Sequence, residues 1–188
     1  AQGWSFNVPT AEFYNSFEEG DSRRDATVLD IEAFATATGS SYTEGYNHTG
    51  YFNNKYIPRA GESGGQTELN YLTNFRIISY SDVLLMAAEA YNRGGIDDGL
   101  AQEFLNQVRR RAFGDNDHDI SASGTALTDA IWEERKFELS LEGHRFFDLV
   151  RTGRASNLIS GFVEGKHEVF PIPQQEIDIS GLTQNAGY

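Results

Sequence analysis

The chain has 188 residues, of which 39% are hydrophobic, and it carries a formal net charge of -13 at pH 7. This length is enough for one sizeable core, so a single domain over residues 1–188 is predicted. The acidic balance argues against a surface that binds nucleic-acid phosphates or anionic lipid, and it favours a neutral or cationic partner. Because the chain has no cysteine, disulfides, thiolate metal sites and a cysteine nucleophile are excluded.

Residues 1–78 are rich in Gly, Ser, Thr, Asn and Tyr and lack a sustained periodicity, so this part is predicted to be mostly loop. Thr10 is positioned to cap a short helix over residues 11–17. Residues 26–36 fit either a strand or a further helical turn, and residues 51–57 alternate enough for a short strand. This loop-rich part is the candidate ligand-binding part.

Residues 79–160 are predicted to form a helical part, because residues 79–153 carry helical periodicity almost throughout. A first helix is predicted from a cap at Ser79 or Ser81 to about Arg93, and the glycines at 94–95 supply a left-handed stop. The apolar run within this helix is far shorter than the roughly 20 residues that span a bilayer. No membrane helix is therefore predicted.

A second helix is predicted to begin at residues 97–98. The arginines at 109–111 lie at its C-terminal end, where cations complement exposed carbonyls, so they require no nucleic acid. The two helices predict an antiparallel hairpin resembling one tetratricopeptide unit, which requires neighbours from the later helices or from a region preceding this chain. The predicted apolar stripe of the second helix is Ala101, Phe104, Leu105, Val108 and Ala112.

A third helix is predicted over roughly residues 128–142, ending at Gly143, and a shorter fourth helix over residues 144–152. Residues 161–188 form a turn-rich tail, in which the proline turn and the terminal Tyr188 are expected to hold the chain end in place.

One face of the third helix carries several ionisable side chains at helical spacing. Charges removed from water must be paired, so these groups predict a structural ion-pair network that locks the third and fourth helices together. A catalytic pair of carboxylates is the alternative interpretation. The predicted network consists of Arg135, Glu138, Glu142, Arg145 and Asp148.

Two further motifs match catalytic or metal-binding patterns in part. Residues 61–65 fit Gly-x-Ser-x-Gly around Ser63, but the flanking residues do not predict the strand and helix that a nucleophile elbow needs. The acidic residues at 115–119 begin like a calcium loop but lack its glycine and bidentate glutamate, which leaves at most a weak cation site. The four histidines have no ligand spacing, so we predict no metal and no cofactor.

Several ordered motifs together resemble one family. The segment Glu-Arg-x-x-Glu-Leu-x-x-Glu-Gly-x-Arg-x-x-Asp-Leu spans residues 134–149, Pro-Ile-Pro-Gln spans 171–174, and Thr-Gln-Asn-x-Gly-Tyr ends the chain. Gly-Asp-x-Arg-x-x-Ala-Thr spans 20–27, where Asp21 is expected to accept backbone hydrogen bonds and Arg23 or Arg24 to pair with a carboxylate. The series resembles the C-terminal portion of the SusD/RagB family, glycan-binding lipoproteins of Gram-negative outer membranes.

The resemblance implies a mainly α fold, with tetratricopeptide-like helical hairpins, long loops and few short strands. It also implies that the protein is not an enzyme but binds oligosaccharides or polysaccharides at the cell surface. The bound glycans would be delivered to a SusC-like TonB-dependent transporter during nutrient uptake. The resemblance further implies membrane attachment through a lipid anchor, added after signal processing. This anchor is expected on an N-terminal part that is missing from this chain.

Aromatic side chains are enriched in the loops before residue 78. Flat rings stack on the C–H faces of sugars, although about half of these aromatics are expected to fill a small core. A helical protein-interaction scaffold and, as a weaker alternative, a glycoside hydrolase using two carboxylates also remain open. The predicted ligand-binding residues are Trp4, Tyr42, Tyr46, His48 and Tyr51.

Overall fold

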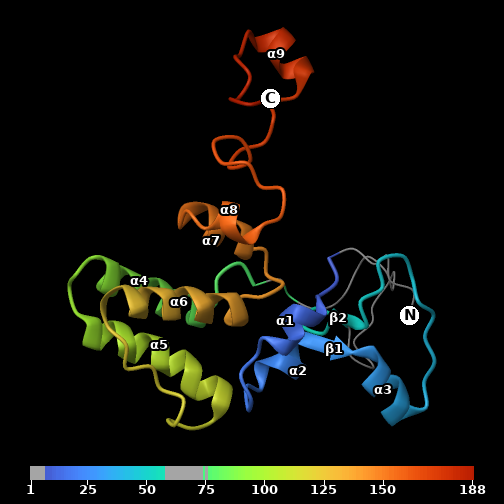
Figure 1. Cartoon of the computed structure of the whole chain (residues 1–188), viewed down its shortest axis with the longest axis vertical. Coiled ribbons are helices and arrows are strands. Elements are labelled where there is room, and N and C mark those ends of the chain that lie inside the picture. Colours follow the sequence, from blue (N-terminus) through green and yellow to red (C-terminus); the bar gives the residue numbers. More distant parts are fainter. Residues whose placement is uncertain (1–6, 58–73, 75) are drawn as a thin grey trace. The chain divides into compact units, whose positions relative to one another are not determined.

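The computed structural model describes residues 7–57, 74 and 76–188, and these residues fold mainly into helices (Figure 1). The strands of the described part form one two-stranded antiparallel sheet. The predicted helical fold with few short strands is therefore confirmed. Two compact units, residues 1–141 and residues 142–188, are described separately below. Within the described residues, we find no helix with the length and apolar character needed to cross a membrane.

The N-terminal part of the first unit is built from short elements. The Thr10 hydroxyl oxygen accepts a hydrogen bond from the Phe13 amide at 3.1 Å, which confirms the predicted cap. The segment that fitted either a strand or a helix contains parts of both. The elements are α1 (Ala11–Asn15), α2 (Arg23–Thr27), β1 (Val28–Asp30), α3 (Ile31–Thr38) and β2 (Tyr51–Asn53).

The small sheet pairs Leu29 of β1 with Phe52 of β2. Strand β2 is shorter than predicted, because the Asn53 side-chain oxygen accepts hydrogen bonds from the amides of Lys55 at 2.9 Å and Tyr56 at 3.2 Å. A side chain that bonds the following backbone forms a turn and so ends the strand.

Three longer helices follow: α4 (Tyr80–Arg93), α5 (Asp98–Phe113) and α6 (Gly124–Glu138). The Ser79 hydroxyl accepts from the Asp82 amide at 3.2 Å, which selects Ser79 of the two predicted caps of α4. Between α4 and α5 the left-handed residue is Gly95, with φ of 63°. The predicted helical hairpin is present, with its stop at the second of the two glycines.

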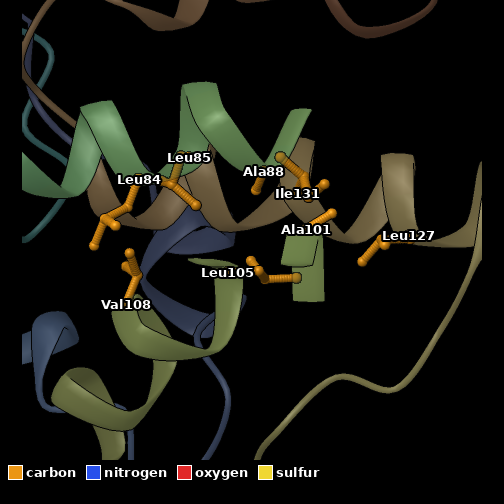
Figure 2. Close-up of a cluster of buried hydrophobic side chains, with 8 residues drawn as sticks. All are labelled: Leu84, Leu85, Ala88, Ala101, Leu105, Val108, Leu127 and Ile131. Atoms are coloured by element: carbon orange, nitrogen blue, oxygen red, sulfur yellow. The ribbon is translucent and has the colours of Figure 1, made fainter. Parts of the chain in front are cut away.

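The core of the first unit lies where α4, α5 and α6 meet. Figure 2 shows leucine, alanine, valine and isoleucine side chains from all three helices pointing toward one another. Helix α6 is thus one of the neighbours that the α4–α5 hairpin requires. The predicted stripe of α5 is confirmed, with Phe104 packed partly buried against the cluster. The cluster is Leu84, Leu85, Ala88, Ala101, Leu105, Val108, Leu127 and Ile131.

The predicted bounds of the third helix were wrong by about one turn at each end. Helix α6 begins early because the Gly124 amide donates to the Asp98 carboxylate at 2.7 Å, a contact with the start of α5. It ends before Leu141, which has a left-handed φ of 63°. Glu142 therefore lies outside the helix and does not extend the face that Arg135 and Glu138 share.

The second unit contains α7 (Arg145–Arg151), α8 (Ala155–Leu158) and α9 (Gln174–Ser180). Helix α7 agrees with the predicted fourth helix. Helix α9 was not predicted, and it begins directly after Pro173. The Gln184 side chain bonds both the amide and the carbonyl of Ile172 at 2.8 Å, and the Tyr188 hydroxyl donates to the Val169 carbonyl at 2.9 Å. These bonds hold the chain end as predicted.

Candidate functional site

An aromatic cluster lies between the loop after α3 and strand β2. The ring of Tyr42 stacks on His48, with centroids 5.5 Å apart, and His48 lies tilted against Phe52 at 5.9 Å. Because Phe52 pairs with Leu29 in the sheet, the strand fixes one end of this cluster. We call Tyr42, His48 and Phe52 the aromatic loop cluster.

Tyr46 lies in the same loop and is 87% exposed. The His48 amide donates to the Gly45 carbonyl at 3.2 Å, which closes a turn with Tyr46 and Asn47 at its corner. Asn47 has a left-handed φ of 60°, a conformation that asparagine tolerates better than most residues. The turn therefore holds the Tyr46 ring out in solvent.

Tyr51 belongs to a different aromatic pair. Its ring stacks on Tyr14 at 4.5 Å, and the Arg24 guanidinium lies 5.1 Å from the centre of the Tyr14 ring. Successive residues of a strand point to opposite faces, which explains why Tyr51 and Phe52 do not join one cluster. Trp4 lies outside the described residues.

The surroundings of Tyr42 are acidic. Its hydroxyl donates to the Glu32 carboxylate at 3.4 Å. Burial first, and then the negative charges of Glu32, Glu44 and Asp30, raise the pKa of Tyr42 above its ordinary value. The phenol therefore stays neutral at physiological pH, as a donor beside carboxylates.

His48 contributes a polar atom that is not satisfied within the described part of the chain. Its Nδ1 atom is shielded from solvent, and no hydrogen-bond partner reaches it among the described residues. A shielded polar atom without a partner costs free energy, about 1–3 kcal/mol in general.

A second group of polar residues forms a buried ion network centred on Arg23 of α2. Its guanidinium contacts Asp21 at 2.6 Å, Glu134 at 2.5 Å and Glu138 at 3.2 Å. The Arg23 amide also donates to Asp21 at 2.9 Å, so both predictions for this motif are confirmed. Arg24, in contrast, pairs with the exposed Asp25.

Two arginines of α5 complete the ion network. Arg109 contacts Glu134 at 2.9 Å and Arg111 contacts Glu138 at 2.5 Å. The predicted helix-dipole role of the arginine run is thus incomplete, because these side chains also neutralise buried carboxylates. We use the term ion network for Asp21, Arg23, Arg109, Arg111, Glu134 and Glu138.

The ion network controls the protonation of Glu138. Burial alone would raise the pKa of this carboxyl, but the Ser81 hydroxyl and the guanidinium groups of Arg111 and Arg23 together hold the pKa below its ordinary value. A general acid needs a raised pKa, so this environment is the opposite of a catalytic acid site.

The contacts in the structure account for only part of the predicted five-residue network. Arg135 contacts Asp82 at 2.8 Å, whereas Glu138 belongs to the ion network. In the second unit Asp148 contacts Arg151 at 2.7 Å. Glu142 and Arg145 also belong to the second unit, so the lock between the two helices stays a prediction.

The acidic residues at 115–119 are engaged by protein groups. Asp115 bonds His118 at 2.9 Å, and Asp119 pairs with Arg110 at 2.5 Å. Within the described ranges, no three His, Asp or Glu side chains gather as a metal site would require. The serine motif at 61–65 lies outside those ranges.

Comparison with known proteins gives consistent results. The model of the SusD family matches residues 1–168. A SusD-like protein of Formosa agariphila is 30% identical over an alignment of 217 residues, which covers 100% of this chain and 41% of that relative. A second SusD-like protein of the same organism is 26% identical and is covered over 35% of its length.

Solved structures show the same fold. A laminarin-binding SusD-like protein has 42% sequence identity and a TM-score of 0.83, over 100% of this chain and 40% of that one. Surface glycan-binding protein A of Bacteroides thetaiotaomicron, solved in complex with laminarihexaose, has 34% identity and a TM-score of 0.83, over 98% and 42%. The chain thus spans about two fifths of the length of these proteins.

Proposed function

Because the chain belongs to the SusD family, we propose that it is the C-terminal portion of a longer protein that binds glycans at the cell surface without cleaving them. We refer to that longer protein as the intact protein. The observation that carries the proposal is the match over the whole chain to solved glycan-binding proteins, one of them holding laminarihexaose. The proposal includes a lipid anchor in the outer membrane and delivery of the glycan to a SusC-like TonB-dependent transporter.

Within this chain, the proposed contact surface is the loop that carries Tyr46 and the aromatic loop cluster. An exposed ring held at the corner of a turn is a flat apolar platform for a sugar ring. The carboxylate of Glu32 and the hydroxyl of Tyr42, which bond each other at 3.4 Å, are the proposed hydrogen-bonding groups for sugar hydroxyls. Trp4 stays a proposed contact from the sequence.

The charge around this loop favours a neutral glycan. Glu32, Glu44 and Asp30 act together on Tyr42, and the chain as a whole has a net charge of -13. Like charges destabilise a complex, so sulfated or uronic acid glycans are disfavoured here. Laminarin is an uncharged glucan, and we propose a glucan of this class as the ligand.

The environment of the buried carboxylates argues that the protein binds glycans rather than hydrolysing them. Glycosidases need one carboxylic acid with a raised pKa and a second carboxylate facing the same bond. Glu134 and Glu138 are instead held by guanidinium groups inside the first unit, and the pKa of Glu138 is lowered. We therefore propose that these carboxylates stabilise the fold and take no part in catalysis.

The test is retention of the intact protein in a native gel that contains laminarin. Tyr46→Ala and Trp4→Ala are expected to reduce retention, while the thermal unfolding midpoint stays unchanged for the exposed Tyr46. Phe170→Ala is the matched control, since its ring is also 80% exposed but lies far along the chain. Unaltered retention of both variants would reject these two contacts.

Two parallel measurements separate the other classes of function. Release of reducing sugar from laminarin would support a glycoside hydrolase. If the intact protein captures a SusC-like transporter but binds no glycan, the helical hairpin acts as a protein-interaction scaffold instead.

A further inference from the structure

The C-terminal end of α6 is closed by a lysine from a distant part of the chain. The Lys55 ammonium donates to the Glu138 carbonyl at 2.8 Å and to the Ser140 carbonyl at 3.2 Å. Carbonyls at the end of a helix lack partners within the helix, and a lysine that donates to them also complements the helix dipole. Lys55 is thus bonded to the point where the chain leaves α6.

A short turn joins Lys55 to strand β2 and so to the aromatic loop cluster. The Asn53 side-chain oxygen accepts a hydrogen bond from the Lys55 amide at 2.9 Å, and Asn53 is the last residue of β2. The preceding residue, Phe52, lies against His48 with ring centroids 5.9 Å apart. A bond that holds Lys55 in place therefore also restrains the strand that ends the loop of residues 40–50.

The partner strand β1 is anchored to the same turn of α6. Helix α2 leads directly into β1 and carries Arg23, whose guanidinium contacts the Glu138 carboxylate at 3.2 Å. Glu138 thus anchors β1 through its side chain and β2 through its backbone carbonyl. Because each strand of the sheet has its own anchor on α6, losing the Lys55 anchor loosens the β2 side while Arg23 still holds the β1 side.

We propose that Lys55 is a positioning residue, which bonds the end of α6 and thereby holds β2 and the aromatic loop cluster in the arrangement that receives the glycan. Lys55 acts through the strand and not through a contact with the sugar. Without its ammonium the loop opens more often, so binding must also order the loop and becomes weaker. The effect on glycan binding rests on the proposed function, whereas the effect on the loop does not.

The first test measures the loop in the absence of glycan. Lys55→Met keeps most of the apolar stem and removes the donors, so amide hydrogen exchange of residues 40–54 in the intact protein is expected to become at least about threefold faster. Lys136→Met is the matched control, because this lysine also lies near the end of α6 but pairs within that helix, with Glu133 at 2.6 Å. Unchanged exchange in Lys55→Met, or an equal increase in Lys136→Met, would overturn the proposal.

The second test separates positioning from general stability by calorimetric titration with laminarihexaose, well below the unfolding midpoint of each variant. Lys55→Met is expected to bind about three- to tenfold more weakly than wild type, and Lys55→Arg, which keeps a cationic donor, to recover the affinity. Leu105→Ala weakens the core among α4, α5 and α6 and is expected to keep the wild-type affinity.

Equal weakening in Lys55→Met and Leu105→Ala would make Lys55 a general stabiliser and overturn the proposal, as would an unchanged affinity of Lys55→Met. If the wild type itself binds no glycan, the proposed function fails, while the exchange experiment still decides whether Lys55 positions the loop.

Discussion

Replacement of Arg23 by methionine tests whether the ion network stabilises the first unit. The side chain of Arg23 is 9% exposed, and its guanidinium contacts Asp21, Glu134 and Glu138. Methionine keeps most of the apolar stem and removes only the charge and its hydrogen bonds. Arg24→Met is the matched control, because Arg24 is the next residue of α2, is 42% exposed and pairs with a carboxylate that is 70% exposed.

The expected cost follows from what remains after the substitution. Breaking a buried ion pair costs about 3–5 kcal/mol, because an uncompensated charge is left behind. Glu134 keeps Arg109 and Glu138 keeps Arg111, so Asp21 alone of the three carboxylates loses its guanidinium partner. The loss therefore belongs at the lower end of that range. We expect Arg23→Met to lower the free energy of unfolding by about 3 kcal/mol and Arg24→Met by less than about 1 kcal/mol.

The assay is urea denaturation of the intact protein, followed by far-ultraviolet circular dichroism. The midpoint of the transition that reports on this unit is compared between the two variants at equal slope. If Arg23→Met and Arg24→Met shift the midpoint equally, the buried contacts do not carry the stability that we assign to them.

Three further predictions rest on the same structure. The pKa of Glu138 in the folded protein lies below its ordinary value of 4.5, so the stability that this carboxylate contributes is complete above pH 4.5 and is lost as the pH falls through the folded pKa. In an acid titration, Glu138→Gln should therefore lose stability less steeply than the wild type. Leu105→Ala in the core should cost about 2–5 kcal/mol in urea denaturation, against less than about 1 kcal/mol for Leu100→Ala, which is 43% exposed; equal costs would contradict the assigned core. Glu32→Gln with Glu44→Gln should strengthen the retention of a sulfated glucan more than that of laminarin, and identical changes for both would remove the proposed charge selectivity.

The features that local sequence determines could be predicted. Thr10 and Ser79 cap helices through hydrogen bonds that span three residues, so the cap and its partner are adjacent in the sequence. The apolar stripe of α5 follows from the helical period alone. The helical hairpin and the family resemblance were derived from such local patterns.

The features that depend on distant residues could not be predicted. Arg23 and Glu134 are 111 residues apart in the sequence, and no spacing rule connects them. Helix α6 starts at Gly124 because a carboxylate on α5 binds its amide, which the sequence around the helix does not show. In the candidate site, the alternation of side chains along a strand could have separated Tyr51 from the aromatic residues of the loop. The stacking of Tyr42 on His48 could not be predicted, because the conformation of the loop follows no periodic pattern.

The most direct test of the central claim is isothermal titration calorimetry of the intact protein with laminarihexaose, followed by chromatography of the recovered sugar. The account predicts saturable binding, unchanged hexasaccharide, and an affinity about two- to tenfold weaker for Tyr46→Ala, the loss expected for one aromatic stacking contact. Absence of binding, or appearance of shorter oligosaccharides, would contradict it.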